Sequence, residues 1–235
     1  MNDPVRFTVP LSCRGIGELN LKSRLNTARR FVGVFAPFAA PKKGCDKDSD
    51  WTDSVRNRLL KMRPDDCDQY PPEANRKKEF MVDFLWEEKK LGKRALLACE
   101  SEWGSDPYGR RNKVKVTYDF DKLLVFKAPF KLLLFESADA DASGNPKKGA
   151  FTIGDVKDML EESLRNYWHH VPGETYVFVD FPSTGKPGTN GRYDAYVWIS
   201  QQLGKQAASV ERLMTGELAR GASTSKDGTA GMAQP

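Results

Sequence analysis

The stretch FMVDFLWEEKKLGKRALLACESEW, residues 80–103, decides the fold of this chain. It contains two runs dense in aromatic and aliphatic residues, 80–87 and 94–103, and a short polar turn over 89–93 separates them. Runs of this length and composition are typical of β-strands. Because so few residues separate them, the pattern predicts an antiparallel hairpin.

Acidic side chains interrupt both apolar strands of this hairpin. With the turn centred on Leu91 and Gly92, Asp83 lies opposite Glu100 and both point to one face of the sheet. Glu102 follows two residues after Glu100 and shares that face. Buried carboxylates are unfavourable unless they are paired or bind a metal ion, so the cluster predicts a magnesium-type site with oxygen ligands. The alternative is a hairpin with one solvated face, which the two glutamates simply mark.

The rest of the chain alternates helical and extended patterns. Apolar residues recur at helical spacing in residues 50–62, 116–127 and 153–168. Short apolar runs typical of strands occupy residues 130–136, 175–181 and 193–199. Loop chemistry is found in residues 138–149 and 183–191, which are rich in turn-forming residues, and residues 63–78 are polar and contain prolines. This order predicts an α/β fold with a central mixed β-sheet flanked by helices.

Composition predicts one domain. The chain has 235 residues, of which 39% are hydrophobic and 29% charged, the balance of a globular domain. We expect a single α/β domain over residues 1–214, with its core at about 50–200. Residues 215–235 are rich in Gly, Ser, Thr and Ala, which predicts a disordered tail.

Several function classes are disfavoured by the same composition. No apolar run is long enough to span a bilayer, and the polar start of the chain lacks the apolar core of a secretory signal, so we expect a cytoplasmic protein that does not enter a membrane. The four cysteines are scattered, and the two histidines, His169 and His170, are adjacent. This pattern argues against a zinc site and against nucleophilic catalysis built on a histidine.

Basic residues flank the two acidic strands. The net charge of +5 favours an anionic partner without requiring one. The basic positions that suit a phosphate backbone are Arg76, Lys77 and Lys78 before the first strand and Arg110, Arg111, Lys113 and Lys115 after the second. The alternative for each run is an ordinary solvated surface.

A lysine follows the acidic strand on the next predicted helix. Lys122 lies three residues after Asp119, beside the apolar positions of 116–127 that must face the sheet. A helix in this place can bring an ammonium over the carboxylates of the preceding strand. Lys131, at the start of the run 130–136, is the alternative lysine, although its position is typical of a solvated strand end.

The order of these residues resembles a known family. Asp83 on one strand, the Glu-Ser-Glu tripeptide 100–102 on the next and Lys122 on the following helix resemble the restriction-endonuclease-like nucleases, the PD-(D/E)XK superfamily. The form it resembles has its catalytic lysine relocated from the strand to that helix. Val82 stands in place of the proline of the motif, and Glu102 stands where the family usually has lysine. Two predicted strands precede the helix, where the family has three.

The resemblance implies a function and a set of roles. Asp83 and Glu100 would bind Mg²⁺ or Mn²⁺ together with the backbone carbonyl of Ser101, and Glu102 would be a further catalytic carboxylate. Lys122 would orient the attacking water or stabilise the pentavalent phosphate. The protein would then be an endonuclease acting on DNA rather than RNA, and a homodimer is compatible with this interpretation. The competing hypothesis is a non-catalytic module of the same fold, which binds nucleic acid or protein and contains only a structural ion network.

Overall fold

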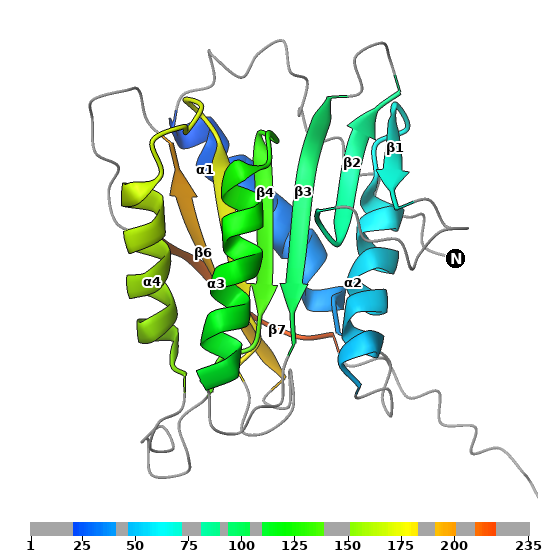
Figure 1. The fold of residues 1–235 in the computed structure, drawn as a ribbon. Coiled ribbons are helices and arrows are strands. Elements are labelled where there is room, and N and C mark those ends of the chain that lie inside the picture. Colours follow the sequence, from blue (N-terminus) through cyan, green and yellow to red (C-terminus); the bar gives the residue numbers. More distant parts are fainter. Residues whose placement is uncertain are drawn as a thin grey trace, which may run out of the picture.

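The computed structural model describes residues 21–40, 47–71, 81–89, 94–103, 110–138, 151–182, 191–200 and 210–219. Within these ranges seven strands form one sheet in the order β1-β2-β3-β4-β5-β6-β7, with helices on both faces (Figure 1). The strands are β1 (Cys67–Tyr70), β2 (Phe84–Glu88), β3 (Ala95–Glu102), β4 (Phe130–Phe135), β5 (Thr175–Asp180), β6 (Arg192–Ile199) and β7 (Glu211–Glu217). The helices are α1 (Leu21–Phe35), the short 3-10 helix η2 (Ala36–Phe38), α2 (Asp48–Met62), α3 (Arg110–Val125) and α4 (Ile153–Asn166). The predicted α/β class with a mixed, helix-flanked sheet is confirmed.

The sheet combines antiparallel and parallel pairs. Strands β1, β2 and β3 form an antiparallel meander, and β5, β6 and β7 form another. Helix α3 connects β3 to β4, and α4 connects β4 to β5, and both of these strand pairs are parallel. Parallel neighbours need such crossover connections. As a result the carboxyl ends of β3, β4 and β5 lie at one edge of the sheet, where Glu102 is in register with Phe135 and Phe135 with Asp180.

The hairpin has the register that the sequence predicts. Phe84 pairs with Cys99, Leu85 with Ala98 and Trp86 with Leu97, as predicted, and the register then shifts by one residue, so that Glu87 pairs with Ala95. Asp83 itself precedes β2, which begins at Phe84. The central residues of the turn, 90–93, lie outside the described part of the chain.

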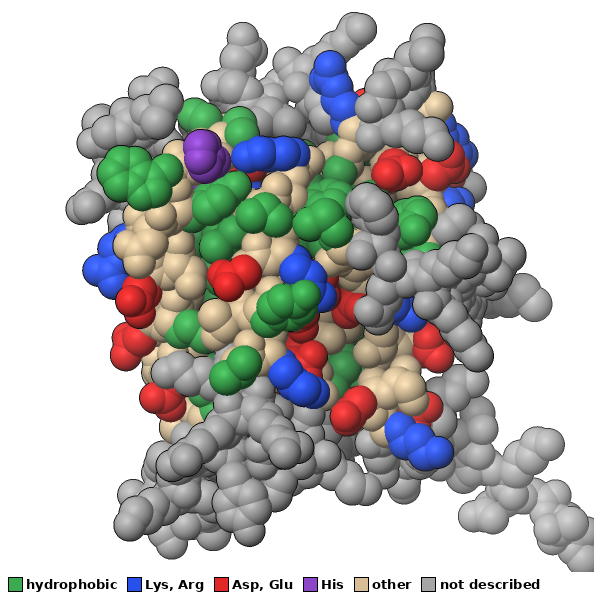
Figure 2. Space-filling view, in the orientation of Figure 1, with side chains coloured by type: hydrophobic (Ala, Val, Ile, Leu, Met, Phe, Trp, Pro, Cys, Tyr) green, Lys and Arg blue, Asp and Glu red, His purple; other side chains and the backbone are tan. Residues whose placement is uncertain are grey.

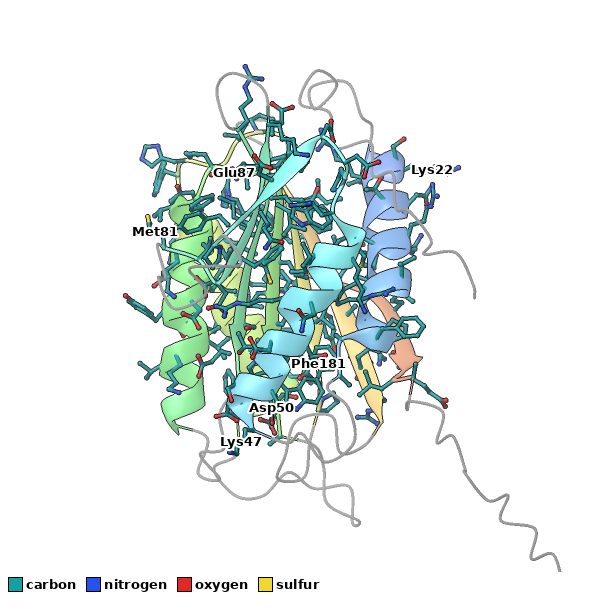
Figure 3. All side chains as sticks on the ribbon, turned by 90° about the vertical axis from the view of Figure 1, so that its right-hand side faces the viewer. Lys22, Lys47, Asp50, Met81, Glu87 and Phe181 are labelled. Carbon is teal, nitrogen blue, oxygen red and sulfur yellow. The ribbon has the colours of Figure 1, made fainter. Side chains whose placement is uncertain are left out.

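The two faces of the sheet are covered by different helices. One core lies under α3 and α4 and includes Ala98, Phe120 and Leu133, and the other lies under α1 and α2 and includes Phe31 and Trp86. Seen along the sheet, α3 and α1 lie on opposite sides of it, and the labelled Met81 side chain lies on the side of α3 (Figure 3). Because side chains alternate along a strand, Glu100 lies on the same face as Ala98, under α3.

Besides the short helix η2, three described elements are absent from the sequence-based prediction. Helix α1 lies before the predicted core, and it buries Ala28, Phe31, Val32 and Phe35 at helical spacing. Strand β1 lies in the polar, proline-containing segment 63–78, for which the sequence predicts no strand; it is a short edge strand in which only Cys67 is buried. Strand β7 continues through Glu217, so the predicted start of the tail at residue 215 is wrong. Pairing with β6 supplies the hydrogen bonds that order β7, and composition does not reveal such pairing.

Helix α3 begins earlier than predicted. The apolar periodicity starts at Val116, but the helix starts at Arg110, because Arg and Lys favour helices as strongly as most apolar residues do. Arg110, Arg111 and Lys113 therefore belong to this helix, although their side chains lie outside the described part of the structure. Residues 76–78 lie outside it entirely. No helix in the described ranges has the length and apolar character needed to cross a membrane.

Candidate functional site

Strand β3 and helix α3 bring together carboxylates and an ammonium. The Nζ atom of Lys122 lies 3.1 Å from Oε1 of Glu100 and 2.7 Å from Oδ1 of Asp119. Glu100 is only 1% exposed, because α3 covers the face of β3 from which it projects. The alternative of a solvated hairpin face is therefore wrong, and the lysine reaches the acid of the preceding strand.

Glu102 has its own basic partner on the same helix. Lys115 Nζ donates a hydrogen bond to Glu102 Oε1 over 2.8 Å. Burial raises the pKa of Glu102 to about 7; Lys115 opposes this rise, whereas the charge of Asp119 and its hydrogen bond to Glu102 add to it. Glu102 and Asp119 thus form a pair of neighbouring carboxyl groups, with a lysine on each side.

Asp83 is directed differently from what the sequence predicts. Its Oδ2 atom accepts hydrogen bonds from the backbone N–H of Ser101 over 2.9 Å and from the Ser101 hydroxyl over 2.8 Å. Arg56 of α2 lies on the other side, with Nη2 3.8 Å from Asp83 Oδ1 and Nε donating to the Asp83 carbonyl. The expectation that Asp83 and Glu100 share one face is wrong in this respect. Asp83 precedes β2, so strand alternation does not orient its side chain, which lies toward Ser101 and α2.

The carboxylates still influence one another electrostatically. Burial raises the pKa of Glu100 to about 9, and the charges of Asp83 and Asp119 add to this rise against the opposing effect of Lys122. Burial also raises the pKa of Asp83, although the hydrogen bonds from Ser101 act against it. Burial acts to lower the pKa of Lys122, but Asp119 and Glu100 raise it overall, so the ammonium stays charged. The site therefore holds more carboxylates than its nearby cations can keep ionised.

The donor chemistry of the site can be compared with what a divalent metal needs. Asp83, Glu100 and the Ser101 carbonyl supply oxygen ligands, the kind that Mg²⁺ and Mn²⁺ prefer. The pKa of Glu100 is raised by burial and by the neighbouring carboxylates, and a bound cation would stabilise the ionised form of these groups. Within the described ranges, however, no three acidic, histidine or cysteine side chains are grouped so that they could hold a metal ion. The donor types fit, while the side chains as placed engage Lys122 and Arg56 instead.

Lys131, the alternative lysine, serves a different part of the molecule. The expectation of a solvated strand end is wrong, because both faces of β4 are covered and Lys131 is fully buried. Its Nζ atom lies 2.7 Å from the hydroxyl of Tyr176, 3.1 Å from Oε1 of Glu174 and 3.4 Å from the carbonyl of Leu124. Lys131 thus belongs to a buried ion pair and not to the cluster around Glu100.

One site residue was not identified from the sequence. Arg56 holds both the carbonyl and the carboxylate of Asp83. The sequence offered one indication: Arg56 directly follows Val55, an apolar residue of the helical repeat of α2 that faces the core. Among the predicted basic contacts, Lys115 is described, and it pairs with Glu102. The face around α3 has Lys and Arg side chains interspersed with Asp and Glu, rather than one continuous basic surface (Figure 2).

No protein-family model, no curated protein and no solved structure matches this chain.

Proposed function

We propose that this chain is a divalent-metal-dependent nuclease of the restriction-endonuclease-like type, which hydrolyses phosphodiester bonds in DNA. The contact between Lys122 and Glu100 at 3.1 Å carries the proposal. A lysine on the helix after the acidic strand reaches the acid of that strand, as the relocated-lysine form of the PD-(D/E)XK superfamily requires.

The order of the elements supports the same family. The sequence predicts two strands before the helix, whereas strand β1 brings the number of described strands before α3 to three, the number that the resembling family has. Helix α3 then leads into β4, which lies parallel to β3. One departure from the family pattern is thereby removed.

The residues of the site have distinct roles in this proposal. Glu100 and the Ser101 carbonyl would hold Mg²⁺ or Mn²⁺ together with Asp83, whose carboxylate would have to leave Ser101 and Arg56 to join them; the bound ion would polarise the phosphate and activate water. Lys122 keeps its charge beside Glu100 and Asp119 and complements the negative charge that develops on the phosphate. Glu102 has a pKa raised to about 7, so it can take up or release a proton near neutral pH.

A non-catalytic module with a structural ion network is the second candidate. It is favoured by the basic partner that each of three carboxylates has: Lys122 for Glu100, Lys115 for Glu102, and Arg56 for Asp83. Ion pairs of this kind can hold carboxylates in a fold without a divalent ion.

Metal titration and DNA cleavage separate the two candidates. Mg²⁺ and Mn²⁺ are titrated calorimetrically into the wild-type chain, Glu100→Gln and the control Glu162→Gln, whose side chain is exposed on α4. The same proteins are incubated with supercoiled plasmid and metal. A nuclease binds metal and cleaves DNA in the wild type and the control, and loses both in Glu100→Gln. A wild-type chain that neither binds metal nor cleaves DNA contradicts the proposal and supports the ion network.

A further inference from the structure

Tyr118 is an exposed aromatic residue beside the candidate site. It lies on α3, one helical turn before Lys122, and 66% of its surface is exposed. The core side of α3 is formed by Val116, Phe120 and Leu123, so the Tyr118 ring has no part in the packing against the sheet. Its described neighbour is Lys122, whose Nζ atom lies 5.2 Å from the centre of the ring. The same ammonium contacts Glu100.

Tyr118 differs from the other exposed aromatic side chains among the described residues. Phe38 is covered on one side by the guanidinium of Arg58, near α1 and α2. Trp168 lies between α4 and β5 and is 88% exposed. Only Tyr118 of these three is placed against a lysine of the site. In the view of Figure 2, exposed apolar side chains lie between lysine and acidic side chains over α3.

This arrangement suits one kind of ligand. A ring face next to an ammonium can accept a base by stacking while the ammonium meets the adjacent phosphate. Bases inside a duplex have both faces covered by their neighbours, so only an unpaired base offers a face to Tyr118. The first turns of α3 contain Arg110, Arg111 and Lys113 and no acidic residue. Basic residues at a helix N-terminus are unfavourable for the helix dipole, but they suit the binding of a nucleic-acid phosphate backbone.

Resting on the proposed nuclease function, we infer that Tyr118 stacks against an unpaired base, so that the chain binds single-stranded DNA, or the unpaired part of a structured DNA, at α3. The phosphate next to that base then lies at Lys122. Duplex DNA of the same length makes the phosphate contacts without the stacking contact, and it binds more weakly.

The test compares single-stranded and duplex binding in chelator. Fluorescein-labelled oligothymidine and a duplex of equal length are titrated with the full chain, Tyr118→Ala, Tyr118→Phe and Trp168→Ala at several salt concentrations. Tyr118→Ala should weaken single-strand binding by about tenfold or more, with the salt slope unchanged, because stacking releases no counterions. Tyr118→Phe keeps the ring, and Trp168→Ala removes an exposed ring that is not part of the candidate site, so both should bind like the wild type.

Three other binding results and two cleavage results would each contradict one of the proposals. Equal single-strand affinity for the wild type and Tyr118→Ala overturns the inference. It is also overturned if Tyr118→Ala weakens duplex binding as much as single-strand binding, or if Trp168→Ala weakens single-strand binding as much as Tyr118→Ala does. A change in self-association of Tyr118→Ala in sedimentation also overturns it, since the face would then bind a second copy. Cleavage assays with Mg²⁺ keep the two proposals apart. If single-strand binding depends on Tyr118 but no cleavage occurs, only the proposed nuclease function is refuted. If Tyr118→Ala changes neither cleavage nor single-strand binding, only the proposed stacking is refuted.

Discussion

Replacing Lys131 by Met should destabilise the fold substantially. Lys131 is fully buried on β4, and its ammonium pairs with Glu174, which is 3% exposed. Methionine matches the length of the lysine stem and fills the same space, so the substitution removes the charge and the hydrogen bonds without opening a large cavity. What remains is a buried Glu174 carboxylate that has lost its cation.

The magnitude follows from this unpaired carboxylate. Removing one partner of a buried ion pair costs about 3–5 kcal/mol. Here Glu174 keeps the hydrogen bond from the Tyr176 hydroxyl at 3.1 Å and has His170 Nδ1 at 3.5 Å, so we expect the lower end, about 3 kcal/mol. For a domain of this size that free energy lowers Tm by roughly 6–12 °C.

Urea denaturation followed by circular dichroism measures the loss. The single variants Lys131→Met and Glu174→Gln should each be destabilised, and the double variant should recover much of the loss of Lys131→Met because no unpaired charge is left. A loss below about 1 kcal/mol in Lys131→Met, or strictly additive effects in the double variant, would refute the reasoning. Either result would mean that the carboxylate reaches solvent when the lysine is gone.

Two further predictions concern the candidate site itself. Lys122→Met should lower the cleavage rate at saturating DNA and metal by roughly 10² or more, while metal affinity is kept or raised because a repelling cation is gone. Single-turnover cleavage measures the rate, and a loss under about tenfold contradicts the role of Lys122. In chelator, wild-type stability should fall as pH rises from 4.5 to about 9, because the raised pKa of Glu100 lets the folded state hold a proton that the unfolded chain releases over this range. Glu100→Gln should reduce this slope, which is at most about 1.4 kcal/mol per pH unit for one proton, and identical slopes for the two proteins in urea titrations would exclude Glu100 as the source.

Short-range patterns in the sequence determine most of the elements. The turn at Leu91 and Gly92 and the alternation of side chains predict the register of the β2–β3 hairpin from Phe84 to Trp86, because turn length and alternation are local properties of the chain; the one-residue shift at Glu87 is not predicted. Helical spacing likewise predicts α2 and α4 close to their observed bounds. The contact between Lys122 and Glu100 also follows from local order, since a helix that connects two parallel strands must pack on the sheet beside the first of them.

Only the tertiary structure decides how the remaining charges are used. Lys131 looks like a strand end in the sequence, but its hydrogen-bond partner Tyr176 comes from β5, 45 residues further along the chain. The Asp83 carboxylate is turned toward α2 by Arg56, which lies 27 residues before it. Strands β1 and β7 are strands because β2 and β6 supply their backbone partners, and their own side chains show little of the alternation that marks a strand. The physical reason is common to all of them: a buried charge or an edge strand is stabilised by groups distant in sequence, and a local pattern carries no information about those groups.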